Sequence, residues 1–376
     1  MIRPVISSIQ ALRAVAAVTV AIMHISGATT TLSDSNVWRW FNKMTLSVGH
    51  SGVDLFFVIS GTIMYLISRE ASTNNLTAFY SFSVHRIFRI YPLYFLTFVF
   101  CLFIIFSGVR APGTANLFQE LTLDVSPVEH PVAWTLPYEV RFYLVVAIII
   151  LLFRRHLDAA LCVWGVIQLG LMMAWTAGLL GFSFFTYVLM TEFSAGLLVG
   201  ALISRGVAKA PRLILLISAA WLSVSCYFVY FDASLVTPYR HLLYEIPAAM
   251  FLYSVVTLEN AGSFKPANAL VYAGGLTYSI YLWHFPLLTY AVQFFGGYRG
   301  GFWFGLLFLL SMIGVTGAVS FLSYHAVEKP TVRLGRALSR RFPTVGLVRV
   351  YRPRFARAAR RPGRCFLAFN RPEALK

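Results

Sequence analysis

The sequence predicts an all-α, polytopic integral membrane protein with about ten transmembrane helices and with both termini in the cytoplasm. Of its 376 residues, 58% are hydrophobic and only 12% are charged, whereas about 25% of the residues in a typical soluble domain are charged. The apolar residues gather mostly in blocks of roughly 17 to 25 residues, the length that an α-helix needs to cross a bilayer.

Ten such blocks follow one another along the chain, and we expect a helix in each: residues 9–27, 52–68, 92–108, 140–153, 160–180, 182–203, 213–231, 241–258, 270–291 and 302–325. The block at 140–153 is short unless its helix begins inside the preceding segment WTLPYEVRFY. The fifth and sixth blocks are separated only by Gly181 and its neighbours, so they form an expected hairpin.

The basic residues predict the orientation of the bundle, because Lys and Arg are retained on the cytoplasmic side of a membrane. With the N-terminus inside, 24 of the 31 Lys and Arg residues fall on the cytoplasmic side and 5 fall outside, while Arg13 and Arg141 lie within or at the edge of spans. We therefore expect the loops at 28–51 and 109–139 outside the cell.

The chain divides into a transmembrane domain at 1–332 and a basic cytoplasmic tail at 333–376. The tail holds thirteen basic residues and one acidic residue, Glu373, and we expect it to be disordered or associated with the membrane. Basic runs beside a final span more often bind anionic lipid than nucleic acid, so no nucleic-acid partner is expected. The four cysteines lack metal-ligand spacing, and no metal is expected.

Two polar residues interrupt the first apolar block, and ionisable residues at bilayer depth are usually functional. Arg13 and His24 are eleven residues apart, which is within about 20° of three full helical turns, so they share one face and lie about 16 Å apart along the axis. The alternative is an arginine and a histidine that separately reach the two membrane surfaces.

Three further residues are expected at the outer level with His24. Asp54 opens the second span, Glu139 opens the fourth after Pro137, and His284 lies in the outer half of the ninth. A carboxylate beside an imidazole orients it as a general base. The alternatives are a helix cap for Asp54 and a favourable helix-dipole position for Glu139.

Two aromatic residues, Trp134 and Tyr138, precede the fourth span on the same side. They are candidates for a surface on which a sugar ring stacks, and the alternative is an ordinary aromatic ring at the membrane interface.

The inner level carries a second polar group. Arg86 and Arg89 are three residues apart and share a helix face, near the expected level of Arg13. Arginine forks suit phosphate oxygens, although simple retention of positive charge inside is the alternative. An acid–base set outside and an anion-binding set inside together indicate a group that is transferred across the membrane from a phosphate-bearing donor.

The motifs at these positions resemble those of the membrane-bound acyltransferase 3 family, particularly the members that O-acetylate bacterial exopolysaccharide. The resemblance covers about residues 6–335 and rests on Arg13-x10-His24, VDLFFVISG, Arg86-x2-Arg89 in HRIFRIYPLY, WTLPYEVRFY, SIYLWHFP and HAVEKP. It implies a ten-helix enzyme of a bacterial inner membrane that takes acetyl from cytoplasmic acetyl-CoA. The acetyl is placed on a hydroxyl of an exported carbohydrate acceptor, which could be lipid-linked.

The resemblance also implies roles for single residues. The histidine that matches His24 is catalytic in the family, and the matching arginines support binding of the donor. For His24 we expect a general base, with a transient acyl-histidine as the competing role, and we expect Asp54 or Glu139 to orient it. The rival hypothesis is a transporter or flippase of a lipid-linked glycan, in which the buried charges line a pathway.

Overall fold

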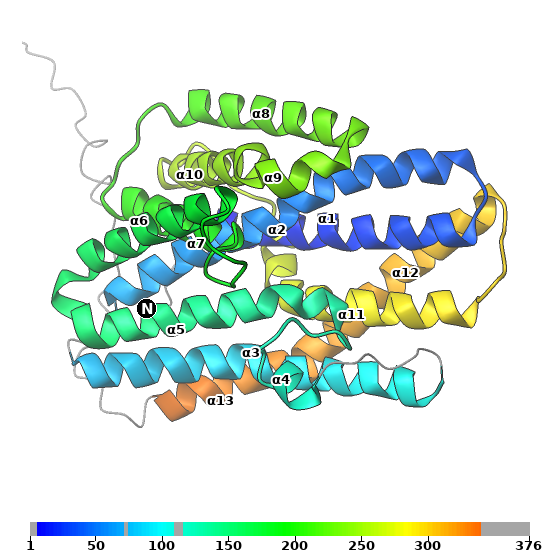
Figure 1. The fold of residues 1–376 in the computed structure, drawn as a ribbon, viewed down its shortest axis with the longest axis horizontal. Helices are drawn as coiled ribbons and strands as arrows, with labels where there is room; N and C mark the ends of the chain where they lie inside the picture. Colours follow the sequence, from blue (N-terminus) through cyan, green and yellow to red (C-terminus); the bar gives the residue numbers. More distant parts are fainter. Residues whose placement is uncertain (1–5, 71–73, 109–115, 340–376) are drawn as a thin grey trace, which may run out of the picture.

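The computed structural model describes residues 6–70, 74–108 and 116–339, and every regular element in these ranges is a helix. The longer helices run back and forth along one axis and form an elongated bundle (Figure 1). They are α1 Ser7–Leu32, α2 Asn36–Glu70, α3 Asn75–Phe106, α5 Leu136–Phe153, α6 Leu157–Thr176, α7 Leu189–Ser204, α8 Pro211–Phe231, α10 Ile246–Asn260, α11 Asn268–Phe294, α12 Phe302–Ser323 and α13 Lys329–Ser339. The predicted all-α class is confirmed.

Short helical segments join or extend these helices. They are α4 Leu117–Leu121, η1 Pro131–Thr135, η2 Arg154–His156, η3 Ala233–Leu235, α9 Val236–Arg240, η4 His241–Glu245 and η5 Tyr324–Glu328. Two of them, η4 and η5, are π-helical turns that run directly into α10 and α13. Such wide turns often occur at functional sites.

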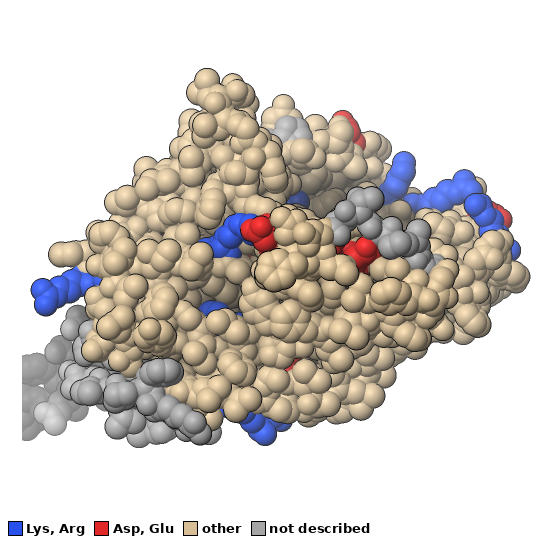
Figure 2. All heavy atoms as spheres, turned by 60° about the horizontal axis from the view of Figure 1, so that its bottom comes forward, with Lys and Arg blue, Asp and Glu red and all other residues tan. Residues whose placement is uncertain are grey.

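Seven stretches of the described chain are long and apolar enough to cross a membrane: Ser7–Leu32, Asn36–Arg69, Asn75–Phe106, Pro131–Thr176, Pro211–Phe231, His241–Asn260 and Phe302–Ser339. Helix α7 is apolar but shorter, and the tyrosines and His284 of α11 lower its mean hydropathy. On the face drawn in Figure 2, charged side chains are sparse and other residues cover most of the surface. The protein is therefore a multi-pass membrane protein, and the number of ten spans remains a prediction.

The connection between the first two helices is much shorter than expected. Most of the predicted loop at 28–51 is helical, because α1 extends to Leu32 and α2 begins at Asn36. The turn is held by the loop between α11 and α12, where Gly300 donates its N–H to the carbonyl of Leu32 (2.9 Å) and accepts from the N–H of Asp34 (3.3 Å). The α1–α2 and α11–α12 turns therefore lie together at one end of the bundle.

The fifth and sixth predicted blocks are separated by a longer segment than a tight hairpin. Helix α6 ends at Thr176, where Gly178 adopts a left-handed φ of +73° and the N–H of Leu179 bonds the carbonyl of Ala174 at 2.8 Å. A glycine in this conformation is a common helix terminator. Residues 177–188 then form an irregular connection before α7 begins.

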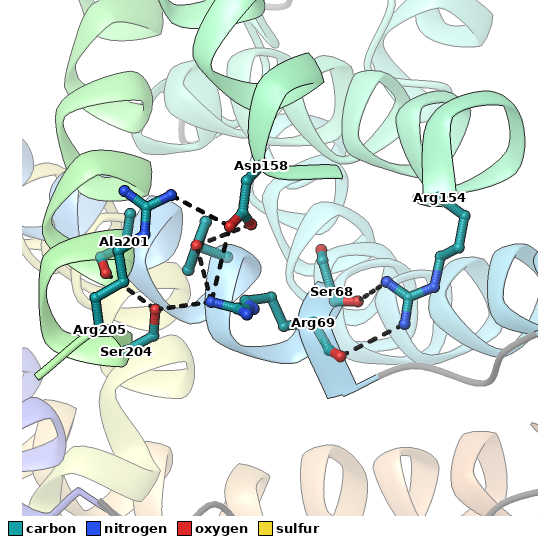
Figure 3. Close-up of polar contacts among 8 residues, drawn as sticks. Ser68, Arg69, Arg154, Asp158, Ala201, Ser204 and Arg205 are labelled. Atoms are coloured by element: carbon teal, nitrogen blue, oxygen red, sulfur yellow. Dashed lines mark hydrogen bonds and ion pairs between the residues drawn. The ribbon is translucent and has the colours of Figure 1, made fainter. Parts of the chain in front are cut away.

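The opposite end of the bundle is tied by a small ionic network, drawn in Figure 3. Asp158 at the start of α6 receives Arg205 from the end of α7 at 3.3 Å and Arg69 from the end of α2 at 3.8 Å. Arg154 donates to the carbonyl oxygen of Ser68 at 2.6 Å and so caps the end of α2. These contacts bring the ends of α2 and α7 and the start of α6 to the same level.

Glycines allow the central helices to approach closely. A Cβ atom at Gly61 of α2 would collide with the carbonyl oxygen of Phe193 in α7, and one at Gly196 of α7 would collide with the carbonyl oxygen of Val58. Small residues at helix interfaces are the usual means of close packing in membranes. Helices α2 and α7 therefore pack with their backbones in direct contact.

The described part of the predicted basic tail is helical. Residues 333–339 belong to α13, which packs along α3, and the Oγ atom of Ser339 lies 2.9 Å from Nε2 of His85. The other residues of the predicted tail, 340–376, lie outside the described residues, as does Cys365.

Candidate active site

The two histidines that the sequence placed at the outer level lie side by side. His24 of α1 and His284 of α11 approach to 3.2 Å between His24 Nδ1 and His284 Nε2, and their ring centroids are 5.2 Å apart. The side chain of His284 is fully buried, whereas that of His24 is partly exposed. His284 thus lies behind His24, which faces the more open side.

The hydrogen bonds of the pair assign the protons on both rings. In each ring Nδ1 lies 3.0 Å from a backbone carbonyl of the preceding helical turn, that of Val20 for His24 and that of Ile280 for His284. A carbonyl can only accept, so both Nδ1 atoms carry the proton in the neutral rings. The lone pair on Nε2 of His284 then accepts from the same Nδ1–H of His24, so this one proton is shared between the carbonyl of Val20 and His284. Nε2 of His24 is left as an unprotonated nitrogen with no partner among the described residues.

The segment before α5 contacts α11 close to His284. Tyr281, one turn before His284, bonds the hydroxyl of Thr135 at 2.7 Å and donates to the carbonyl oxygen of Val132. Phe285 meets the ring of His24 edge-on, with centroids 5.4 Å apart. The contacts of Tyr281 hold α11 against η1, and the contact of Phe285 holds it against α1.

A third imidazole, that of His130, lies in the segment that precedes η1. Its ring stacks on Tyr94 with centroids 6.0 Å apart, and its Nε2 atom lies 3.0 Å from the hydroxyl of Thr97. Burial lowers the pKa of His130 to about 3, so the ring stays neutral at physiological pH. A small pocket lies nearby between α3 and α11, and Glu129 is the one charged residue that lines it.

The three predicted arginines gather inside the bundle. Arg13 from α1 and Arg86 and Arg89 from α3 are partly buried, and within the described ranges none of them forms an ion pair with a carboxylate. The Nε atom of Arg86 is buried without a hydrogen-bond partner, and its guanidinium lies 5.3 Å from the ring centre of Tyr143. This arrangement leaves positive charge available to an anion.

Two carboxylates lie near these arginines without pairing directly. Glu139 accepts a hydrogen bond from Tyr143 one turn along α5, and Glu328 accepts one from Ser279 at 2.7 Å. Both act electrostatically on Arg89. The sequence grouped Glu139 with His24. In the structure its hydrogen bond is with Tyr143, whose ring also contacts Arg86, and no hydrogen bond joins it to a histidine of the described chain.

Asp54 also has a different partner from the one expected. Its carboxylate is fully buried and is held by the Arg240 fork, with Nε to Oδ1 at 3.0 Å and Nη2 to Oδ2 at 2.8 Å. Arg240 also donates from Nε to Glu192 at 3.3 Å. The expected hydrogen bond between Asp54 and His24 is not among those of the described residues.

Sequence reasoning missed Arg240 because its position between two apolar blocks suggested an exposed loop cation. The signal that could have found it is the pair of acids in neighbouring spans, Glu192 and Glu245, for which no partner was identified. Buried carboxylates need a cation or a hydrogen-bond donor. Arg240 supplies the cation for Glu192, and Thr191 donates to Glu245 at 2.7 Å.

The two aromatic candidates differ in exposure. The rings of Trp134 and Tyr138 meet edge-on at 6.2 Å, and Trp134 is partly exposed. Tyr138 is only 3% exposed and packs against Phe184 and Tyr187. Tyr138 therefore belongs to the core of the bundle, and only Trp134 offers a surface to a ligand.

Comparisons with known proteins found a family match and a relative of this chain. The acyltransferase domain family matches residues 6–325. The exopolysaccharide production protein ExoZ of Rhizobium meliloti (strain 1021) is 28% identical over 324 residues, which represent 77% of this chain and 92% of that protein. No solved structure matches the chain. Since the family match spans the helices that carry the histidine pair and the three arginines, the chain belongs to the membrane-bound acyltransferase 3 family.

Proposed function

We propose that the protein transfers an acetyl group from cytoplasmic acetyl-CoA to a hydroxyl of an exported, exopolysaccharide-like carbohydrate. The observation that carries the proposal is the presence of two different polar groups on one continuous helix. Helix α1 holds Arg13 among the unpaired arginines and His24 beside His284, about 16 Å apart at 1.5 Å per residue. The similarity to a protein of exopolysaccharide production supports a carbohydrate acceptor.

The arginine cluster is the proposed donor site. Coenzyme A carries phosphates, and Arg13, Arg86 and Arg89 have no carboxylate ion pair within the described chain that would compete for them. Charge-assisted hydrogen bonds from arginine to phosphate are among the strongest in proteins. Glu139 and Glu328, which act electrostatically on Arg89, offset part of the positive charge.

His24 is the proposed general base for the acceptor. Its Nε2 atom takes the proton of the attacking hydroxyl, the hydroxyl oxygen bonds the acyl carbon, and the carbon–sulfur bond of the thioester breaks to release the coenzyme A thiolate, which then takes up a proton. His284 accepts from Nδ1 of His24 and holds the ring in the tautomer that leaves Nε2 free. General-base catalysis of this kind typically contributes 10²–10⁴-fold.

The proposed membrane arrangement has ten spans and both termini in the cytoplasm of a bacterial inner membrane. It consists of the seven apolar stretches, with Pro131–Thr176 divided at η2, together with α7 and α11. The ionic end of the bundle that includes Arg69 and Arg205 then faces the cytoplasm, in accordance with the retention of positive charge.

The function is tested with membranes, labelled acetyl-CoA and the host's own surface polysaccharide after its esters have been removed by mild alkali. We expect alkali-labile label on the glycan, and none with the His24→Ala variant at a matched membrane level. Absence of label with the native protein would contradict the proposal. Movement of a lipid-linked glycan without ester formation would favour the transporter hypothesis instead.

A further inference from the structure

A histidine outside the pair, His50 of α2, has no assigned role although it is partly exposed, as His24 is. Its side chain is partly exposed, and no hydrogen bond of its ring nitrogens is found with the described residues. One ring neighbour is Tyr244, with centroids 6.3 Å apart. A partly buried imidazole with uncommitted nitrogens is available to a ligand.

The packing of α1 on α2 places His50 near the level of His24. A Cβ atom at Gly49 would lie 2.6 Å from the Cβ atom of Met23, so the residues that precede the two histidines touch. His50 is also within electrostatic range of His24. Two imidazoles with free nitrogens therefore occupy adjacent helices at one depth.

The segment from α9 to η4 holds this part of α2 at two points. The hydroxyl of Tyr244 donates to the carbonyl of Ser47 at 2.7 Å, and the Arg240 fork binds Asp54. His50 lies between these two anchors, one turn before Asp54. The π-helical turn η4 sets the spacing of Arg240 and Tyr244, so the anchors depend on a geometry that a regular α-helix would not supply.

We propose that His50 is a second acceptor-contacting residue, which hydrogen-bonds a hydroxyl adjacent to the one that His24 deprotonates, and that Arg240 positions it through Asp54. The ligand chemistry is a sugar that carries two neighbouring hydroxyls. This inference rests on the proposed function, because it assigns a further contact in the same acceptor site.

The assignment separates the acceptor from the donor in kinetic terms. His50 of α2 lies near His24 of α1, whereas the arginines proposed for the donor site lie further along α1 and on α3. Removal of its side chain should weaken acceptor binding while the chemistry at His24 continues. One lost neutral hydrogen bond corresponds to about 1 kcal/mol, or roughly a fivefold change in affinity.

The experiment measures acetyl transfer from labelled acetyl-CoA to the alkali-treated host polysaccharide by full-length protein in membranes. For His50→Ala we expect an acceptor KM raised about fivefold or more, an unchanged donor KM and a kcat within about threefold of the native value. His50→Asn, which keeps a donor and an acceptor, should recover part of the acceptor KM. Arg240→Lys, which loses the planar fork, should also raise the acceptor KM.

His156→Ala is the matched control, because His156 is exposed in η2 at the opposite end of the bundle. It should leave both KM values unchanged. Equal changes in donor and acceptor KM for His50→Ala, or no change in either, would overturn this inference. A native protein that transfers no acetyl would instead overturn the proposed function, so the two failures are distinguishable.

Discussion

The Nδ1 atom of His24 lies 3.2 Å from the Nε2 atom of His284, although the two residues are 260 positions apart in the chain. This contact gives the two rings different roles in the proposed reaction. The partly exposed ring of His24 keeps a free nitrogen for the acceptor. The buried ring of His284 acts only through His24.

The first prediction follows from that division. His24→Ala should lower kcat by about 10²–10⁴-fold, since the proposed base is lost. His284→Ala should lower kcat by a smaller factor, because Nε2 of His24 remains and only its orientation is weakened. Both are measured as acetyl transfer at matched membrane levels. A larger loss for His284→Ala than for His24→Ala would reverse the two roles.

The second prediction concerns the donor. The double variant Arg86→Ala/Arg89→Ala should weaken acetyl-CoA binding by at least about tenfold, because each hydrogen bond to a charged group contributes roughly 1.5–3 kcal/mol. The measurement is the ligand-induced rise in the thermal midpoint of purified protein. The matched control is Arg333→Ala/Arg336→Ala, an exposed pair with the same spacing on α13. Equal losses in both double variants would remove Arg86 and Arg89 from the donor site.

The third prediction concerns stability and compares two Arg–Asp pairs in one chain. Arg240 and Asp54 are 6% and 0% exposed, whereas Arg299 and Asp34, 3.1 Å apart, are 63% and 61% exposed. Arg240→Gln leaves buried carboxylates without a cation and should cost about 3–5 kcal/mol, while Arg299→Gln should cost at most about 1 kcal/mol. Thermal unfolding in detergent should show a clearly larger drop for Arg240→Gln, and similar drops would refute the structural role of the buried pair.

The fourth prediction concerns orientation. In a background without native cysteines, a membrane-impermeant maleimide should label Asn36→Cys in intact spheroplasts. Asn36 is exposed at the start of α2, in the segment that is expected outside the cell. Ser263→Cys, which is exposed between α10 and α11, should be labelled only after lysis. The reverse pattern would invert the bundle and place the arginines on the outer side.

The sequence predicts what depends on local periodicity. Arg13 and His24 share a face because α1 is one unbroken helix, and Arg86 and Arg89 adjoin because they are three residues apart. The depth of His284 follows from the alternating direction of the spans. These relationships need no knowledge of which helices are neighbours.

What the sequence does not predict is the choice among partners at similar depth. Asp54 and His24 lie in adjacent helices, yet the carboxylate binds Arg240, since a planar cation satisfies a buried charge better than a neutral ring. Glu139 accepts a hydrogen bond from Tyr143, one turn along its own helix. The choice of Arg240 by Asp54 depends on the rotation of each helix about its own axis, which tertiary packing determines.

The glycine contact between α2 and α7 has a consequence for the charges nearby. Gly61 follows Asp54 by two turns, and Gly196 follows Glu192 by one, so this close approach of the two backbones lies just beyond the carboxylates that share Arg240. The direct contact of the two backbones therefore sets the distance between Asp54 and Glu192, which the guanidinium of Arg240 must bridge. A single methyl group added at either glycine would lengthen that gap without altering a charged residue.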